Sequence, residues 1–129
     1  MARSELLHLY GETDGSSTSG TFSLSSPDFS GSVSYIRIPK GMKLKIWCKR
    51  ISGEVATLIK IGFTRDVTVS SPTWVTIGTE YLASPGEIIL EKRRPIVVEG
   101  ITGKEAIAVT WSQGTAGKAY VELEVEVSE

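Results

Sequence analysis

The 129-residue sequence contains one histidine, one cysteine and no asparagine. A single cysteine cannot form an internal disulfide bond. One Cys and one His also cannot supply the four nitrogen or sulfur ligands of a structural zinc site. No glycine-rich segment ends in the Gly-Lys-Ser/Thr sequence that binds nucleotide phosphates. We therefore expect no catalytic residue, no metal and no cofactor, and interpret the protein as a non-enzyme.

The two rare reactive residues both have simple structural interpretations. His8 lies between two leucines near the N-terminus. A general base needs a rigid partner within hydrogen-bonding distance, and the sequence around His8 suggests none, so a surface or edge-strand position is expected. Cys48 alternates with Leu44 and Ile46, and a free cysteine on an apolar face packs as a small hydrophobic residue.

Long apolar runs are also missing. No stretch approaches the roughly 18 apolar residues that a membrane-spanning helix requires, and the N-terminal residues are too polar for the core of a signal peptide. We expect the protein to be intracellular or part of a virion. The composition is 40% hydrophobic and 22% charged, with a net charge of -1, which is typical of one globular domain.

The amide side chains are unusually few. Gln113 is the only glutamine, and Glu accounts for 12 of the 15 acidic residues. Amides are thermolabile, and loss of Asn and Gln with enrichment in Glu is typical of hyperthermophile proteins. The composition therefore predicts an organism or virus of a hot environment.

Short apolar segments separated by Gly and Pro follow one another along most of the chain. Many short strands with turns between them predict an all-β fold, an antiparallel β-sandwich of eight to nine strands with jelly-roll or immunoglobulin-like topology. Residues 1–20 are expected to be an N-terminal segment with a flexible Ser/Gly linker, in which residues 5–10 are a first strand or a single helical turn. Residues 21–129 are expected to be a single sandwich domain. The predicted strands are 21–25, 33–38, 42–49, 54–63, 73–77, 87–92, 96–99, 105–112 and 119–127.

Two of these strands alternate strongly. In residues 42–49 the apolar face holds Cys48, and the opposite face holds Lys43, Lys45, Trp47 and Lys49. In residues 119–127 the polar face holds Glu122, Glu124 and Glu126. Because opposite charges on adjacent strands attract, we expect these strands side by side, in one subunit or across a subunit boundary. Residues 104–127 are also predicted to form one long hairpin.

Two further binding interpretations remain open. Residues 29–53 contain six basic residues and no acidic one, and a basic aromatic surface of this kind can bind nucleic acid. The near-neutral net charge speaks against this, so nucleic acid is an unlikely partner. Trp111 is expected in the core, whereas Trp47 and Trp74 are expected on the outer side of their strands. There they could be buried under a loop or in a subunit interface, which we favour, or stack on sugar rings.

The strand spacing and composition of residues 21–127 resemble small β-sandwich and single-jelly-roll virion proteins, especially those of viruses of hyperthermophilic archaea. The resemblance implies a structural subunit of a capsid, decoration or attachment type that forms homo-oligomers. The alternatives are a carbohydrate-binding module and a nucleic-acid-binding protein. The interface or binding candidates are Lys43, Lys45, Trp47, Lys49, Trp74, Glu122, Glu124 and Glu126.

Overall fold

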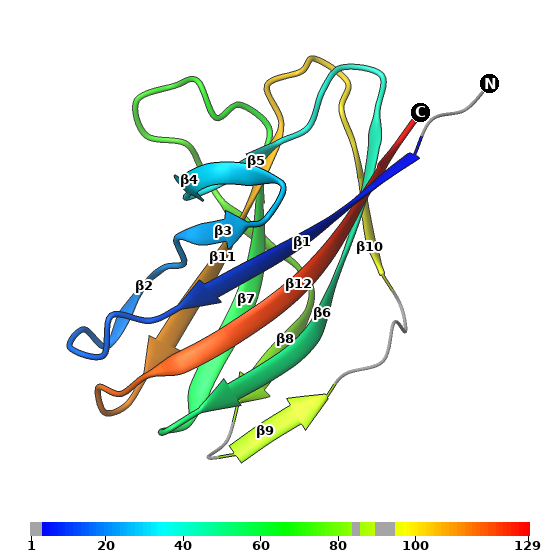
Figure 1. Cartoon of the computed structure of the whole chain (residues 1–129). Helices are drawn as coiled ribbons and strands as arrows, with labels where there is room; N and C mark the ends of the chain where they lie inside the picture. The colour runs from blue at the N-terminus through cyan, green and yellow to red at the C-terminus, as the bar shows by residue number, and fades with distance from the viewer. Residues whose placement is uncertain (1–3, 84–85, 90–94) are drawn as a thin grey trace.

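Two antiparallel β-sheets form a sandwich in the computed structural model, which describes residues 4–83, 86–89 and 95–129 (Figure 1). The predicted all-β sandwich is thereby confirmed. Within these ranges the structure contains no helix that is long and apolar enough to cross a membrane.

Within the described ranges sheet A has seven strands and sheet B has five, more than the eight to nine predicted, because several short strands and β1 were not counted. The strands of sheet A are β1 (Ser4–Glu12), β3 (Leu24–Ser26), β4 (Phe29–Val33), β6 (Lys43–Gly53), β9 (Gly86–Ile89), β10 (Ile96–Glu99) and β12 (Ala119–Ser128). Their order is β10-β6-β12-β1-β3-β4, and β9 pairs with β6. The strands of sheet B are β2 (Ser19–Thr21), β5 (Ile36–Arg37), β7 (Thr57–Thr64), β8 (Val75–Ala83) and β11 (Ala106–Gln113). Their order is β2-β11-β7-β8, and β5 pairs with β11.

The short strands near the N-terminus differ from the prediction. The expected strand 21–25 is divided between β2 in sheet B and β3 in sheet A. The chain crosses the core between them, where Phe22 and Leu24 are both buried. Alternation continues across such a crossing, so the pattern could not reveal it. The first residues of the predicted strand 87–92 belong to β9. Residues 90–92 of that predicted strand lie outside the described ranges.

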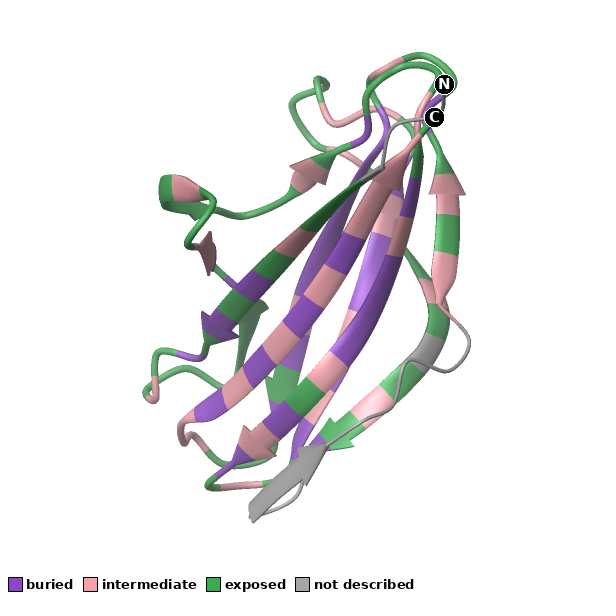
Figure 2. Ribbon diagram, turned by 45° about the vertical axis from the view of Figure 1, so that its right-hand side comes forward, coloured by how far each residue is buried: buried purple, intermediate pink, exposed green. Residues whose placement is uncertain are grey.

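The core lies between the sheets, as the alternation predicted. In Figure 2 buried residues alternate with less buried ones along the long strands. The inward faces of the neighbouring strands β6 and β12 both pack into the core. β6 contributes Leu44, Ile46 and Cys48, and β12 contributes Val121 and the alternate residues after it. Complete burial of an aliphatic side chain contributes about 1.5–3 kcal/mol, so these two strands supply much of the stability of the fold.

The predicted long hairpin is wrong. β11 pairs with β7 in sheet B, whereas β12 pairs with β6 and β1 in sheet A. The loop between them therefore crosses from one sheet to the other. Gln113 anchors this crossing, because its Nε2 donates to Thr57 Oγ1 and to the Gly117 carbonyl, each at 2.9 Å. The only glutamine of the chain is thus a buried loop anchor.

The boundary expected at residue 20 does not separate the N-terminal segment from the sandwich. β1 pairs with β12 over nine residues, from Ser4–Ser128 to Glu12–Tyr120. Beyond β1, Thr13 Oγ1 accepts a hydrogen bond from the Ala119 amide at 2.9 Å and donates to the Gly117 carbonyl at 2.8 Å. The Ser/Gly composition suggested a linker, but the chain before it supplies a full strand of sheet A.

Candidate functional site

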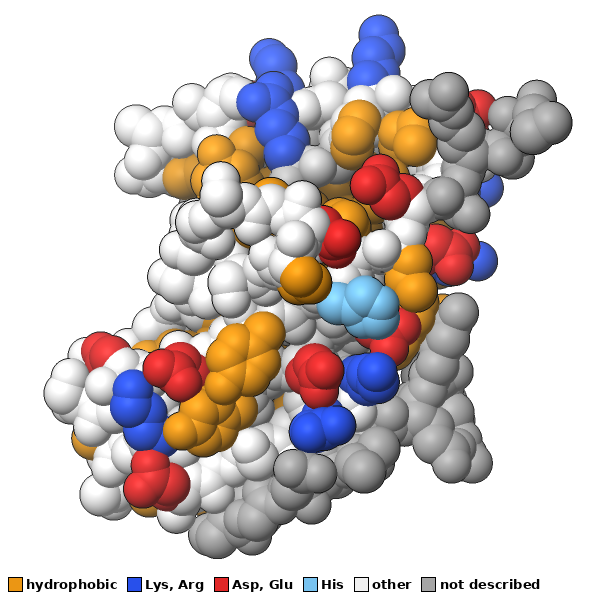
Figure 3. Space-filling model, in the orientation of Figure 1, with side chains coloured by type: hydrophobic (Ala, Val, Ile, Leu, Met, Phe, Trp, Pro, Cys, Tyr) orange, Lys and Arg blue, Asp and Glu red, His pale blue; other side chains and the backbone are white. Residues whose placement is uncertain are grey.

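The two charged strands are neighbours, which confirms their predicted side-by-side arrangement within one chain. β6 and β12 are antiparallel, with Lys45 opposite Glu126 and Trp47 opposite Glu124. Acidic and basic side chains are interspersed on this face of sheet A (Figure 3). The charges that suggested an interface are therefore largely complementary inside the subunit.

A β-bulge changes which residues form the ion pairs. The register shifts between Glu122 and Leu123, so Arg50 lies opposite Glu122. Arg50 Nε lies 3.3 Å from a Glu122 carboxylate oxygen, and Lys49 Nζ lies 3.3 Å from one of Glu124. Strict alternation would turn Arg50 inward, which is why the sequence did not predict its role. Cross-strand pairs of this kind contribute about 0.2–1 kcal/mol each.

Lys43 pairs with a different strand than expected. Its Nζ lies 4.0 Å from a Glu99 oxygen of β10, and both side chains are well exposed. The basic face of β6 therefore has carboxylates on both flanking strands, β12 and β10. This arrangement does not favour binding of a polyanion, because local carboxylates repel phosphates. The sequence has a further basic run, Lys-Arg-Arg at 92–94, which lies outside the described residues.

Trp47 is not an exposed aromatic platform. It lies opposite Glu124, on the other side of sheet A from Cys48, yet it is only 4% exposed. Alternation correctly excluded it from the core cluster, but alternation does not reveal whether the outer side of a sheet is covered. Trp47 is thus too buried to stack on a sugar ring.

Cys48, Trp111 and His8 lie in the core or at the surface, as the sequence predicted for each. Cys48 is buried, and burial raises the pKa of its thiol to about 12. Trp111 is in the core, with its ring centroid 6.4 Å from that of Phe22. His8 is exposed on β1 opposite Glu124. The described residues contain no group of three or more His, Cys, Asp or Glu placed to bind a metal.

Trp74 is the exposed tryptophan that the prediction sought. It immediately precedes β8 and is 37% exposed. The ring lies over Gly62 of β7, where an added methyl group would be 3.7 Å from Trp74 Cβ and Cε3, an ordinary van der Waals distance. The indole therefore lies along the outer surface of sheet B, with part of it open to solvent.

Hydroxyl groups surround this indole. A cavity of about 260 Å³ is lined by Trp74, Gly62, Ala108 and three hydroxyl residues, Thr21, Ser34 and Thr110. They come from segments far apart in the sequence, since β2 and β7 flank β11 on opposite sides. We call this the Trp74 cavity. An aromatic wall with a few hydroxyls has the composition of a site for a neutral polar ligand with an apolar face.

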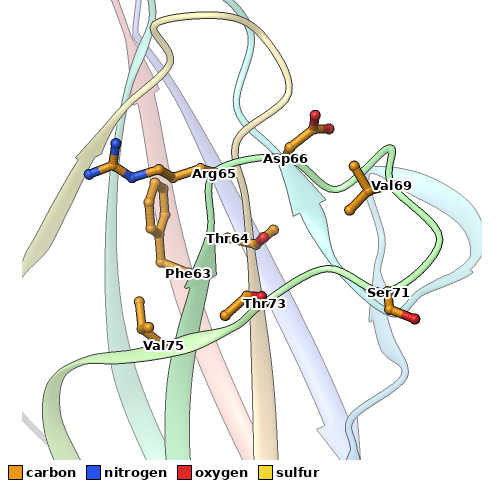
Figure 4. Close-up of a pocket in the computed structure, with 8 residues that line it drawn as sticks. All are labelled: Phe63, Thr64, Arg65, Asp66, Val69, Ser71, Thr73 and Val75. Atoms are coloured by element: carbon orange, nitrogen blue, oxygen red, sulfur yellow. The ribbon is translucent and has the colours of Figure 1, made fainter.

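A second site at one end of the sandwich was not predicted. Two cavities, of about 430 and 370 Å³, share Phe63 and Arg65 in their lining. The first is formed largely by the β7–β8 loop, including Val69, and by Val75 at the start of β8 (Figure 4). The second is formed by β10 and the loop after it, including Val98 and Ile101. We call the two together the Phe63–Arg65 cleft.

The loop at this end is held by a buried carboxylate. Glu105 is 5% exposed and accepts hydrogen bonds from the amides of Ile101, Thr102 and Gly103 at 3.0–3.2 Å. Burial opposes ionisation, but these backbone hydrogen bonds outweigh it and lower the pKa of Glu105 to about 2. The Glu105 carboxylate is therefore ionised and hydrogen-bonded to the backbone of its own loop.

Comparisons with known proteins add little about function. No family model matches the sequence, and no curated protein matches it. A search of solved structures finds the carbohydrate-binding module TmCBM61 in complex with beta-1,4-galactotriose, with a TM-score of 0.39 and 13% identity. The match covers 84% of this chain and 63% of that one, less than two thirds of its length. A similarity at this level carries no argument about the residues or ligand of this protein.

Proposed function

We propose that this protein is a non-enzymatic binding module that holds a carbohydrate in the Trp74 cavity. The observation that carries the proposal is the position of Trp74, which is backed by Gly62, partly exposed, and flanked by hydroxyl groups. The apolar C–H face of a pyranose ring fits an indole, and the hydroxyls of Thr21, Ser34 and Thr110 suit the rim of the sugar. An aromatic side chain needs little ordering on binding, because it has only two rotatable bonds.

Replacing Trp74 by alanine should lower the affinity for a binding oligosaccharide at least tenfold, because the stacking surface is lost. The measurement is calorimetric titration with glucose, galactose, mannose and xylose oligosaccharides. The matched control is Leu82→Ser on β8, which removes an exposed apolar side chain outside the Trp74 cavity. Absence of binding across the panel, or equal binding by both variants, would contradict the proposal.

A second candidate is a self-assembling subunit, of the virion type from a hyperthermophile-associated source. One observation favours it: Leu82 is 57% exposed and lies opposite Leu58 on sheet B. An aliphatic pair of which one member is exposed and the other half-buried is better suited to a protein interface than to a sugar. Since the charges of β6 and β12 pair within the chain, association through apolar side chains of sheet B is the arrangement we propose for this candidate.

For the assembling subunit, light scattering behind size exclusion should show an oligomer that Leu82→Ser dissociates, because the variant places a hydroxyl in the buried interface. The mass should change little with salt, since the contact is apolar. Trp74→Ala serves as the comparison, and under the carbohydrate proposal it would alter sugar binding without altering mass. A 14.0 kDa species at low and high salt alike would exclude this candidate.

A further inference from the structure

The Phe63–Arg65 cleft combines apolar walls with a cation. Phe63 lines both of its cavities, Val69 and Val75 line one, and Val98 and Ile101 line the other. The rest of the lining is polar: hydroxyl residues, Arg65, and the carboxylates of Asp66, Glu99 and Glu105. Such a composition favours a ligand with an apolar part and a small number of polar atoms.

Arg65 is the residue that gives the cleft its charge. Its side chain extends over Phe63 and away from Asp66, Val69 and Ser71 (Figure 4). Among the described residues, Arg65 forms no ion pair, in contrast to Lys49 and Lys60. A guanidinium with open donors binds a carboxylate through two parallel hydrogen bonds.

The carboxylates near Arg65 interact with other groups. Asp66 accepts hydrogen bonds from the Thr68 amide at 2.9 Å and from the Thr68 hydroxyl, and these bonds lower its pKa. Glu105 is held by its own loop, whereas Glu99 has only an exposed, 4.0 Å pair with Lys43. Among the described residues none of these three carboxylates forms an ion pair with Arg65, so its guanidinium donors are open to an incoming anion.

We propose that the Phe63–Arg65 cleft binds a small organic anion, a carboxylate carrying a short apolar chain. Arg65 pairs with the carboxylate, and the apolar chain lies against Phe63 and the valines of one cavity. The site is separate from the Trp74 cavity, since the two share no lining residue. It therefore does not depend on the carbohydrate proposal.

The test is an amide-resolved NMR titration of the full chain with sodium hexanoate, hexanamide and sodium acetate. Hexanamide removes the charge, and acetate removes most of the apolar chain. We expect hexanoate to shift amides of residues 63–75 and 98–105, with an affinity at least tenfold higher than either of the others. Each of the two parts of the ligand is thereby tested separately.

Substitution of Arg65 identifies the cation. Arg65→Gln should reduce hexanoate affinity at least tenfold, to the level of hexanamide, whereas Arg65→Lys should lose less because it keeps the charge. Lys104→Gln is the matched control, because Lys104 is exposed in the same group of loops but lines neither cavity. The amide spectrum of each variant also reports whether it is folded.

Several results would overturn the proposal. They are equal affinity for hexanoate and hexanamide, unchanged binding by Arg65→Gln, and no shift at the solubility limit of hexanoate. Shifts confined to residues 20–21, 74 and 108–110 would also overturn it, because the anion would then occupy the Trp74 cavity. Loss of carbohydrate binding in the Trp74→Ala variant would leave this proposal unaffected.

Discussion

Gly100→Ala is expected to destabilise the protein by about 3 kcal/mol or more, because overpacking against fixed backbone is costly. A Cβ atom at this position would lie 2.1 Å from the Pro39 carbonyl oxygen and 3.0 Å from Ile38 Cγ2. The backbone there is held from both sides, since Gly100 N donates to the Met42 carbonyl at 2.8 Å and the Gly41 amide donates to the Gly100 carbonyl at 2.7 Å. The clash can be relieved only by separating the two loops.

Guanidinium chloride unfolding of the purified variants measures this effect. Gly114→Ala is the matched control, because an added methyl group there would have no atom within 4 Å. We expect its free energy of unfolding to stay within about 0.5 kcal/mol of the parent protein. Similar midpoints for the two variants would show that the contact between the Gly100 and Pro39 loops does not hold in solution.

Glu105→Gln is expected to lower the free energy of unfolding by about 2–3 kcal/mol at neutral pH, because hydrogen bonds to a charged group are lost. The neutral amide keeps one acceptor oxygen, but its NH₂ group would face amides that donate. Glu105→Gln retains the size of the side chain, so a packing defect does not complicate the comparison.

The same variant gives a pH dependence with a definite sign. Because the folded-state pKa of Glu105 is lowered from 4.5 to about 2, its stabilisation is complete above the unfolded-state value. It decreases as the pH falls from about 4.5 to about 2, where the folded protein also binds the proton. The difference in stability between the parent and Glu105→Gln should therefore shrink over this range.

Unfolding experiments between pH 2 and pH 7 test this prediction. Asp14, whose pKa is lowered to about 2 by hydrogen bonds from Ser17 and Ser16, is present in both proteins, so its contribution cancels in the difference. Glu99→Gln is the control, because its exposed pair with Lys43 is 4.0 Å long and should contribute little. A parent–variant difference that stays constant from pH 7 to pH 2 would contradict the role assigned to Glu105.

The core and one strand pair could be predicted because their signals are local. The period of two in β6 and β12 separates inward from outward side chains, and both strands bury the predicted faces. Their opposite charges also predicted that the two strands lie side by side, and the structure places Lys45 opposite Glu126. The pairing of Glu122 with Arg50 was missed, because a bulge adds one residue to one strand only.

The sequence was a poorer guide to two other properties: which outward side chains are covered by another segment, and how consecutive strands are connected. Trp47 and Trp74 have similar sequence settings, yet Trp47 is 4% exposed and Trp74 is 37% exposed. The outward side of a strand depends on whether another segment covers it. The expected hairpin 104–127 failed for a related reason, because Gln113 and the loop after it lead from one sheet to the other.

The sequence alone was sufficient to predict an all-β sandwich, the core-facing sides of β6 and β12, and the packing of Cys48 in the core. These properties depend on composition and on alternation within single strands. Three arrangements could not be read from single strands: the pairing of β1 with β12, the position of Trp74 over Gly62, and the cleft lined by Phe63 and Arg65. These arrangements join segments distant in the chain, and their geometry arises only when the two sheets have packed together.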